Sequence, residues 1–201
     1  MGWFFRLISF DQIFNATLAP IIKRRCNDMQ FQDISYLEKG TTRQQKAYAV
    51  LQQNNVMEKL RVFTPALVGT IPINIDIETS DLDIICCFES KNFYRDTIVS
   101  LFKDFELFSI REREEKEETV IAGFFTEGFM IEIFGQNIPC RQQLGYRHML
   151  VEHELLNKYG EPFRQQIIAL KKQGYKTEPA FAKLLGLQGD PYHALLQLEQ
   201  L

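Results

Sequence analysis

Three acidic residues and one glycine turn have the types and spacing of a metal-binding site. Asp81 and Asp83 stand at alternate positions of an apolar segment, and Glu132 stands alone between two isoleucines. Ten residues separate the turn Gly69-Thr70 from Asp81. Carboxylate oxygens are the ligands that Mg²⁺ prefers, and this ion keeps waters that substrate phosphates can replace. The chemistry of such a site is phosphoryl or nucleotidyl transfer, in which two ions clamp the attacking and leaving oxygens.

Strand geometry would place these carboxylates on one face of a sheet. Side chains alternate faces along a strand, so Asp81 and Asp83 point one way while Leu82 and Ile84 point into the core. At an effective dielectric constant of about 20, two charges about 4 Å apart repel by roughly 4 kcal/mol. Glu132 adds to this repulsion if its strand is adjacent, so the cluster needs a cation, a shared proton or open water. The alternative is a turn residue at Asp81 and unrelated solvated acids at the other two positions.

The elements that must position these residues follow from hydrophobic patterns and turn signals. Thr42 is predicted to cap a helix over residues 43–59, and Ser90 a helix over 91–104. Strands are predicted at 64–68, 82–88, 105–110, 119–125 and 129–134, the last two forming a hairpin. Helices are predicted at 142–159, 162–173, 179–185 and 191–201. Asp76 and Glu78 also alternate with isoleucines, but we assign them to a loop because residues 84–88 form the better buried strand.

This order of elements predicts an α+β fold, a mixed β-sheet core with helices followed by a C-terminal helical unit. We assign residues 29–139 to the core and 140–201 to a helical region packed on it. Residues 1–28 are interpreted as a dispensable extension or an incorrectly assigned start. Their positive charges follow the apolar part, the wrong order for a secretory signal. The alternative for this segment is an amphipathic helix that binds a membrane surface or a partner.

Composition limits the class of protein further. A chain of 201 residues, 45% hydrophobic and 24% charged, suits one compact domain. The net charge of −3 argues against a protein that coats long nucleic acids. No apolar run approaches the roughly 18 residues that cross a membrane. The four cysteines match no zinc spacing and are interpreted as buried free thiols, so we expect a cytoplasmic protein.

The acidic motif resembles the signature of the polymerase-beta-like nucleotidyltransferase superfamily. That signature has a glycine turn, Asp-x-Asp about ten residues later, and a later acid between hydrophobic residues. Thr70 departs from the usual Gly or Ser but keeps the hydroxyl that can bond a phosphate. From about residue 29 the chain more closely resembles a small uncharacterised bacterial family of that superfamily. The stretches that carry this closer resemblance are Val68–Ile73, Asp76-Ile77, Ser80–Asp83, Phe134–Gln136, Gln142-Gln143, Tyr146–Met149 and Glu178–Ala182.

The wider resemblance implies Mg²⁺-dependent nucleotidyl transfer from a nucleoside triphosphate, with Mn²⁺ as an alternative ion. Asp81 and Asp83 would hold the ions, and Glu132 would bind the second ion or act as a base. The acceptor would be a small molecule, a protein or an RNA end. A related chemistry, pyrophosphate transfer to a nucleotide, suits the same fold class. The alternative is a non-catalytic module that keeps the fold and senses a nucleotide or binds a protein, as an antitoxin does.

A triphosphate needs hydrogen-bond donors and positive charge. Gly69 allows the backbone to approach a phosphate, and the hydroxyls of Thr70 and Ser80 can donate to it. Lys171 and Lys172 form a basic cluster that could reach the phosphates from the helical region. The alternative for these lysines is a solvated helix end that the helix dipole favours.

A second polar cluster lies in the predicted helix at 142–159. His148 and Glu152 are four residues apart and share a helix face, which could line the substrate cleft. Arg147 in particular could contact substrate. An equal alternative to substrate binding is that these residues form ion pairs on the helix surface and pack on the sheet. A zinc site made by His148, Glu152 and His153 is disfavoured because two of these three lie on different faces.

Overall fold

A five-stranded mixed sheet forms the centre of the molecule, in a computed structural model that describes residues 31–113 and 117–200. The strand order is β1-β2-β5-β4-β3, with β2 and β5 parallel and the other pairs antiparallel. The strands are β1 (Ala66–Val68), β2 (Leu82–Cys87), β3 (Glu106–Arg113), β4 (Thr119–Thr126) and β5 (Phe129–Gln136). The extension predicted at residues 1–28 lies outside the described residues.

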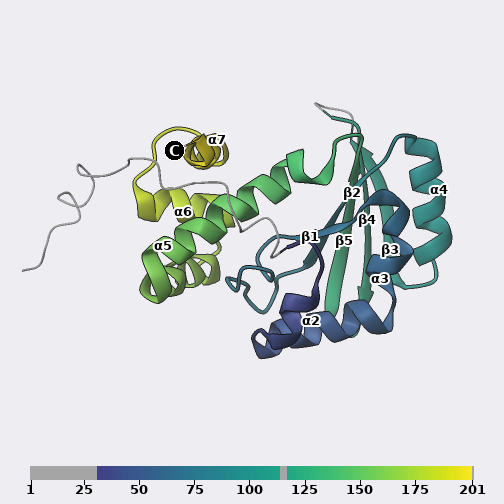
Figure 1. The fold of residues 1–201 in the computed structure, drawn as a ribbon, viewed down its shortest axis with the longest axis horizontal. Coiled ribbons are helices and arrows are strands. Elements are labelled where there is room, and N and C mark those ends of the chain that lie inside the picture. Colours follow the sequence, from purple (N-terminus) through teal and green to yellow (C-terminus); the bar gives the residue numbers. More distant parts are fainter. Residues whose placement is uncertain (1–30, 114–116, 201) are drawn as a thin grey trace, which may run out of the picture.

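Helices cover the sheet from two sides (Figure 1). The first group is α2 (Thr42–Gln53), α3 (Val56–Lys59) and α4 (Lys91–Phe102). The second group is α5 (Leu144–Lys172), α6 (Thr177–Leu185) and α7 (Pro191–Leu196). Short 3₁₀ helices lie at Ser35–Lys39, Arg61–Phe63, Cys140–Gln142 and Gln197–Gln200. The predicted α+β class with a C-terminal helical unit is confirmed. Within the described ranges, no helix has the length and apolar character that crossing a membrane requires.

Two hydrophobic cores lie on opposite faces of β2. Leu82 and Ile84, both fully buried, belong to the core that α2 and α4 cover. Ile85 belongs to the other core, with Met149 of α5 and Phe181 of α6. Because side chains alternate along the strand, Asp83 is on the face toward α5. The prediction that Leu82 and Ile84 point into the core is confirmed.

Two predicted helix caps and the bounds of one predicted helix can be compared with the structure. Ser90 caps α4 as predicted, its side chain accepting a hydrogen bond from the backbone N–H of Phe93. The cap of α2 is Thr41 rather than the predicted Thr42, because Thr41 and Gln44 form a reciprocal capping box. The predicted helix over 43–59 is wrong in its continuity, since Asn55 has a left-handed backbone (φ 51°) and separates α2 from α3.

The long helix α5 changes direction where the sequence predicted a break. Gly160 has a non-helical backbone (φ 74°), two residues before Pro162. Beyond the kink, Arg164 donates to the carbonyl oxygens of Ile73 and Asn74, and Lys171 Nζ donates to that of Ile75 at 2.9 Å. The second half of α5 therefore holds the loop that joins β1 to β2.

Candidate functional site

The parallel pairing of β2 and β5 brings two of the predicted acids side by side. Asp83 is the register partner of Glu132, and Asp81 immediately precedes β2. Burial, followed by repulsion from Asp81 and Glu132, raises the pKa of Asp83 from 3.8 to about 7. Burial and the charge of Glu132 also raise the pKa of Asp81, while Arg43 lowers it. The three carboxylates therefore interact through their charges.

The glycine turn lies directly against Asp83. Gly69 has a positive φ of 84°, and a Cβ at this position would lie 2.5 Å from Asp83 Oδ2. Thr70 Oγ1 donates to Ser80 Oγ at 3.3 Å, and Ser80 Oγ accepts from the backbone N–H of Ile77. Gly69, Thr70 and Ser80 thus lie at the same corner of the sheet as the acids. A side chain at position 69 would be strained and would displace the Asp83 carboxylate, so the glycine allows the backbone to approach this acid closely.

The donor set fits a hard cation such as Mg²⁺, since it offers three carboxylates, one of them held against a glycine turn. The carboxylate oxygens are not gathered at one point, however. In the described part of the chain, one oxygen from each of Asp81, Asp83 and Glu132 cannot be chosen so that all three lie within 4.8 Å of one another. Glu132 Oε1 instead pairs with the guanidinium of Arg111 at 3.3 Å. This ion pair occupies Oε1 and leaves Oε2 of Glu132 available to a cation.

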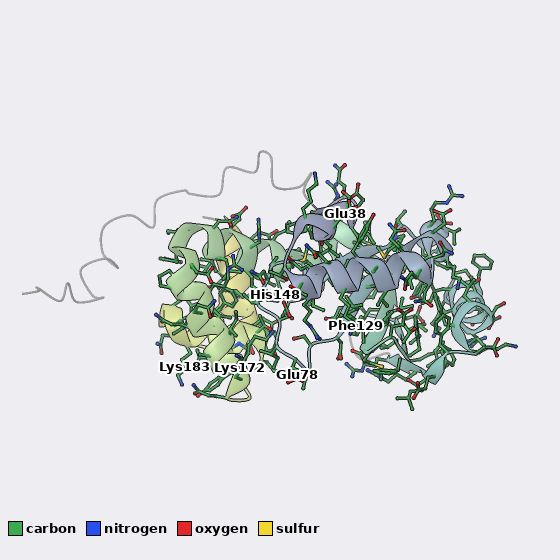
Figure 2. The ribbon with its side chains drawn as sticks, turned by 90° about the horizontal axis from the view of Figure 1, so that it is seen from below. Glu38, Glu78, Phe129, His148, Lys172 and Lys183 are labelled. Carbon is green, nitrogen blue, oxygen red and sulfur yellow. The ribbon has the colours of Figure 1, made fainter. Side chains whose placement is uncertain are left out.

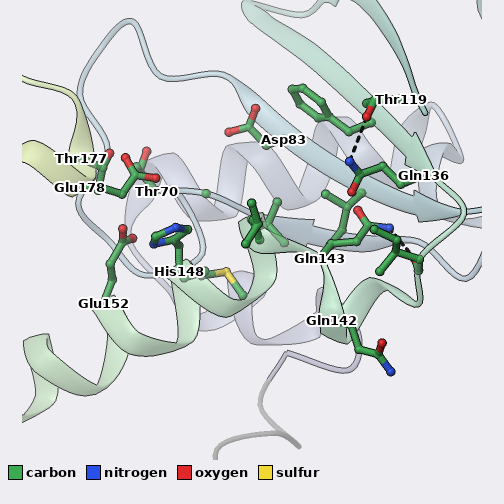
Figure 3. A pocket seen from close by; sticks show the side chains of 18 of the residues that line it. Thr70, Asp83, Thr119, Gln136, Gln142, Gln143, His148, Glu152, Thr177 and Glu178 are labelled. Carbon is green, nitrogen blue, oxygen red and sulfur yellow. Dashed lines mark hydrogen bonds between the residues drawn. The ribbon is translucent and has the colours of Figure 1, made fainter. Parts of the chain in front are cut away.

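A cavity of about 620 Å³ separates Asp83 from the helical region (Figure 3), and neither Asp81 nor Glu132 is among its lining residues. Gly69, Thr70 and Asp83 line one wall, and His148 and Glu152 of α5 line the other. Ligand sites typically have volumes of about 300–1,000 Å³, so this cavity has the size for a nucleotide.

The basic residues predicted to bind phosphate have different positions. Lys171 is buried, and burial lowers its pKa to about 8 although Glu152, Asp76 and Asp83 raise it. Lys172 is exposed at the rim of the helical region, whereas His148 faces the rest of the molecule (Figure 2). Arg147 makes a two-nitrogen contact with Glu199 Oε2, at 2.6 and 3.0 Å, and does not line the cavity. The structure thus brings Lys171, but neither Lys172 nor Arg147, toward the acids.

Arg43 is a site residue that sequence reasoning missed. From α2 it donates to the carbonyl oxygens of Glu78 and Ser80 and pairs with Asp76 at 3.2 Å. It therefore holds the loop that leads into Asp81. One arginine in a helix carries no signal of this role, because the contact joins residues more than 30 positions apart.

Glu178 was also missed as a site residue. It lies in the first turn of α6 and forms a group with His148 and Glu152, with one ligand atom of each within 4.8 Å of the others. His153 is elsewhere, with its ring against Phe31. The acidic first turn was visible in the sequence, but its approach to α5 depends on the packing of the two helices.

Several solved structures are similar to this chain. An RNA terminal uridylyl transferase, Cid1, is 9% identical, with a TM-score of 0.50 over 81% of this chain and 52% of that one. A MgGTP-bound Cid1 poly(U) polymerase is 10% identical, with a TM-score of 0.48 over 83% and 50%. A GLD-2/RNP-8 complex is 12% identical, with a TM-score of 0.44 over 79% and 59%. The chain spans about half the length of these proteins, and the fold argument rests on the first.

The molecule therefore has a nucleotidyltransferase-like fold. Residues 49–198 match the family described as Domain of unknown function (DUF4269), and the chain belongs to that family. No protein of curated function matches its sequence. The predicted resemblance to an uncharacterised family is confirmed by this match.

Proposed function

We propose that this protein is a Mg²⁺-dependent nucleotidyltransferase that moves a nucleotidyl group from a nucleoside triphosphate to a hydroxyl-bearing acceptor. The observation that carries the proposal is the environment of Asp83. This carboxyl is largely buried, stands beside Glu132 in the register of β2 and β5, touches the Gly69 turn and faces a cavity of about 620 Å³. A fold of the nucleotidyltransferase type supports the same conclusion.

The residues of this chain have distinct roles in the proposed reaction. Asp81 and Asp83 would hold Mg²⁺ or Mn²⁺, which supplies positive charge to the triphosphate when bound. The acceptor oxygen bonds to the α-phosphorus while the bond from that phosphorus to pyrophosphate breaks. Glu132 would bind a second ion or take the proton of the acceptor hydroxyl.

The triphosphate would lie along the Gly69 turn. The backbone there is open to close approach, and the hydroxyls of Thr70 and Ser80 are within reach of the same corner. Lys171 supplies a buried positive charge near Asp83. Lys172 and Arg147 would assist only after a rearrangement, because the first is exposed and the second is paired with Glu199.

The acceptor remains a class rather than a compound: a small molecule, a protein or an RNA end. The net charge of −3 and the acidic wall of the cavity disfavour a long nucleic acid.

The pairing of Glu132 with Arg111 favours a second candidate, a non-catalytic module that senses a nucleotide or binds a protein. In an enzyme, Arg111 would compete with the ion or proton for the Glu132 carboxylate. In a sensor it can stay paired, and nucleotide binding would then need no divalent cation.

Thermal denaturation with each of the four nucleoside triphosphates tests the proposal, using Mg²⁺ or a chelator. A ligand at 100 times its dissociation constant stabilises a protein by about 2.7 kcal/mol, which is a shift of several degrees here. We expect a Mg²⁺-dependent shift in the wild type that is lost in Asp83→Asn and kept in Asp104→Asn, an exposed acid after α4. A shift that persists in chelator supports the nucleotide sensor. No shift with any nucleotide refutes both the enzyme and the nucleotide sensor and leaves the protein-binding module.

A further inference from the structure

His148, Glu152 and Glu178 form a compact group on the cavity wall opposite Asp83. One ligand atom of each lies within 4.8 Å of the others, and all three side chains line the cavity. Figure 3 shows the imidazole and the two carboxylates directed toward one another from α5 and α6. His148 and Glu152 are one helical turn apart, which places them on one face of α5.

Two of these side chains are buried, and one of them has a buried atom without a hydrogen-bond partner. His148 is 6% exposed, and its Nδ1 is fully enclosed with no hydrogen-bond partner. Glu152 is 3% exposed, and its side chain lines the cavity beside His148. An unsatisfied buried polar group typically costs about 1–3 kcal/mol, and a charged one more. A ligand bound between His148 and Glu152 would offset this cost for the imidazole.

Neighbouring charges supply only part of the compensation. Lys171 interacts with Glu152, but its Nζ donates to the carbonyl oxygen of Ile75. The same lysine also faces Asp83, Asp76 and Glu178, so its charge is shared among four carboxylates, of which Asp76 also pairs with Arg43. The acid at position 178 is explained by its place in the first turn of α6, where the helix dipole favours a negative charge. Position 152 has no such explanation.

We propose that His148, Glu152 and Glu178 bind a divalent transition-metal ion of the zinc type, with an open coordination position facing the cavity. One imidazole and two carboxylates are a mixed nitrogen and oxygen donor set of the kind that Zn²⁺ accepts, and three protein ligands leave a fourth position for water or substrate. Metal–ligand distances of about 2.0–2.2 Å place two ligand atoms about 3–4 Å apart, so small side-chain rotations complete the site. The inference does not depend on nucleotidyl transfer.

The protonation of His148 is consistent with this site. Burial lowers the pKa of its imidazole, which favours the neutral form that binds metals. Burial and the charge of Glu178 raise the pKa of Glu152, and a cation bound beside this carboxylate would oppose that rise.

The test is isothermal titration calorimetry, in which Zn²⁺ is added to the untagged full chain after chelator treatment. The metal content of the protein is then measured after desalting. We expect one ion per chain, with at least about a 100-fold weaker affinity in Glu152→Gln and in Glu178→Gln. Glu154→Gln is the matched control, since Glu154 is on the same helix but not in the cavity lining. It should bind as the wild type does.

Asp83→Asn separates this site from the proposed Mg²⁺ site, and it should keep full Zn²⁺ affinity. Co²⁺ substitution gives a second readout, because a site without thiolates lacks sulfur charge-transfer bands. Circular dichroism checks that each variant is folded; Glu152→Gln keeps the side-chain shape and removes a buried charge. The proposal fails if the wild type binds no stoichiometric Zn²⁺, if the Gln variants bind equally well, if thiolate bands appear, or if Asp83→Asn abolishes binding.

Discussion

Replacing Asp83 with Asn should stabilise the metal-free protein while removing its proposed function. Asp83 has a pKa of about 7 in the folded protein against an ordinary value of 3.8, chiefly because of burial and then because Asp81 and Glu132 repel it. Each pKa unit is worth about 1.4 kcal/mol, so ionised Asp83 costs the folded protein about 4 kcal/mol above pH 7. Asn keeps the shape of the side chain without the charge.

The stability difference between the wild type and Asp83→Asn should depend on pH in a definite direction. Between pH 3.8 and about 7 the folded protein holds the Asp83 proton more tightly than the unfolded chain does. The wild type therefore loses stability relative to Asp83→Asn as the pH rises through this range, and the difference is constant above it. Because Asn still buries a polar amide, we expect at least about 1 kcal/mol of the 4 to be recovered at pH 8, or about 2–4 °C in Tm.

The assay is thermal denaturation in chelator from pH 4.5 to 8.5, with Asp104→Asn as the control. The control should show no pH-dependent advantage, because Asp104 is exposed. Adding Mg²⁺ should stabilise the wild type and reduce or reverse the advantage of Asp83→Asn. A difference between the two proteins that is the same at every pH would show that Asp83 is not held protonated, and the argument from burial and repulsion would be refuted.

Two further variants test the surroundings of this carboxyl. Gly69→Ala should cost about 1–2 kcal/mol and abolish triphosphate binding, because φ is 84° and the new Cβ would lie 2.5 Å from Asp83 Oδ2; unaltered Tm and binding would contradict this. Arg43→Ala should cost about 1–2 kcal/mol and weaken Mg²⁺ binding, because Arg43 holds the carbonyl oxygen of Ser80 at 2.9 Å. Arg61→Ala, with a side chain 80% exposed, is the control, and equal Tm changes in the two arginine variants would refute the role of Arg43.

The strand that carries the Asp-x-Asp motif could be predicted because its pattern is local. A period of two assigns Leu82 and Ile84 to one face and Asp83 to the other, whatever the strand pairs with. The cap at Ser90 and the hairpin between β4 and β5 also depend on residues close in sequence. The break at Gly160 followed from the adjacent Pro162, although the helix resumes beyond it.

The partners of the candidate site could not be predicted in the same way. Glu132 was identified as an acid on a strand, but its place next to Asp83 depends on the parallel pairing of two distant segments. Its ion pair with Arg111 depends on a third strand. A one-dimensional pattern contains no information on such registers, because many pairings satisfy the same hydrophobic alternation.

The sequence alone determined which side chains of each element face the core, since periodicity and capping arise from neighbours along the chain. It also determined the identity of the acidic motif and its glycine turn. Only the tertiary structure decided that Arg147 pairs with Glu199 and that Glu178, rather than His153, joins His148 and Glu152. The physical reason is that these outcomes depend on how α5, α6 and the C-terminal segment pack. That packing minimises the free energy of the whole molecule rather than of any one segment.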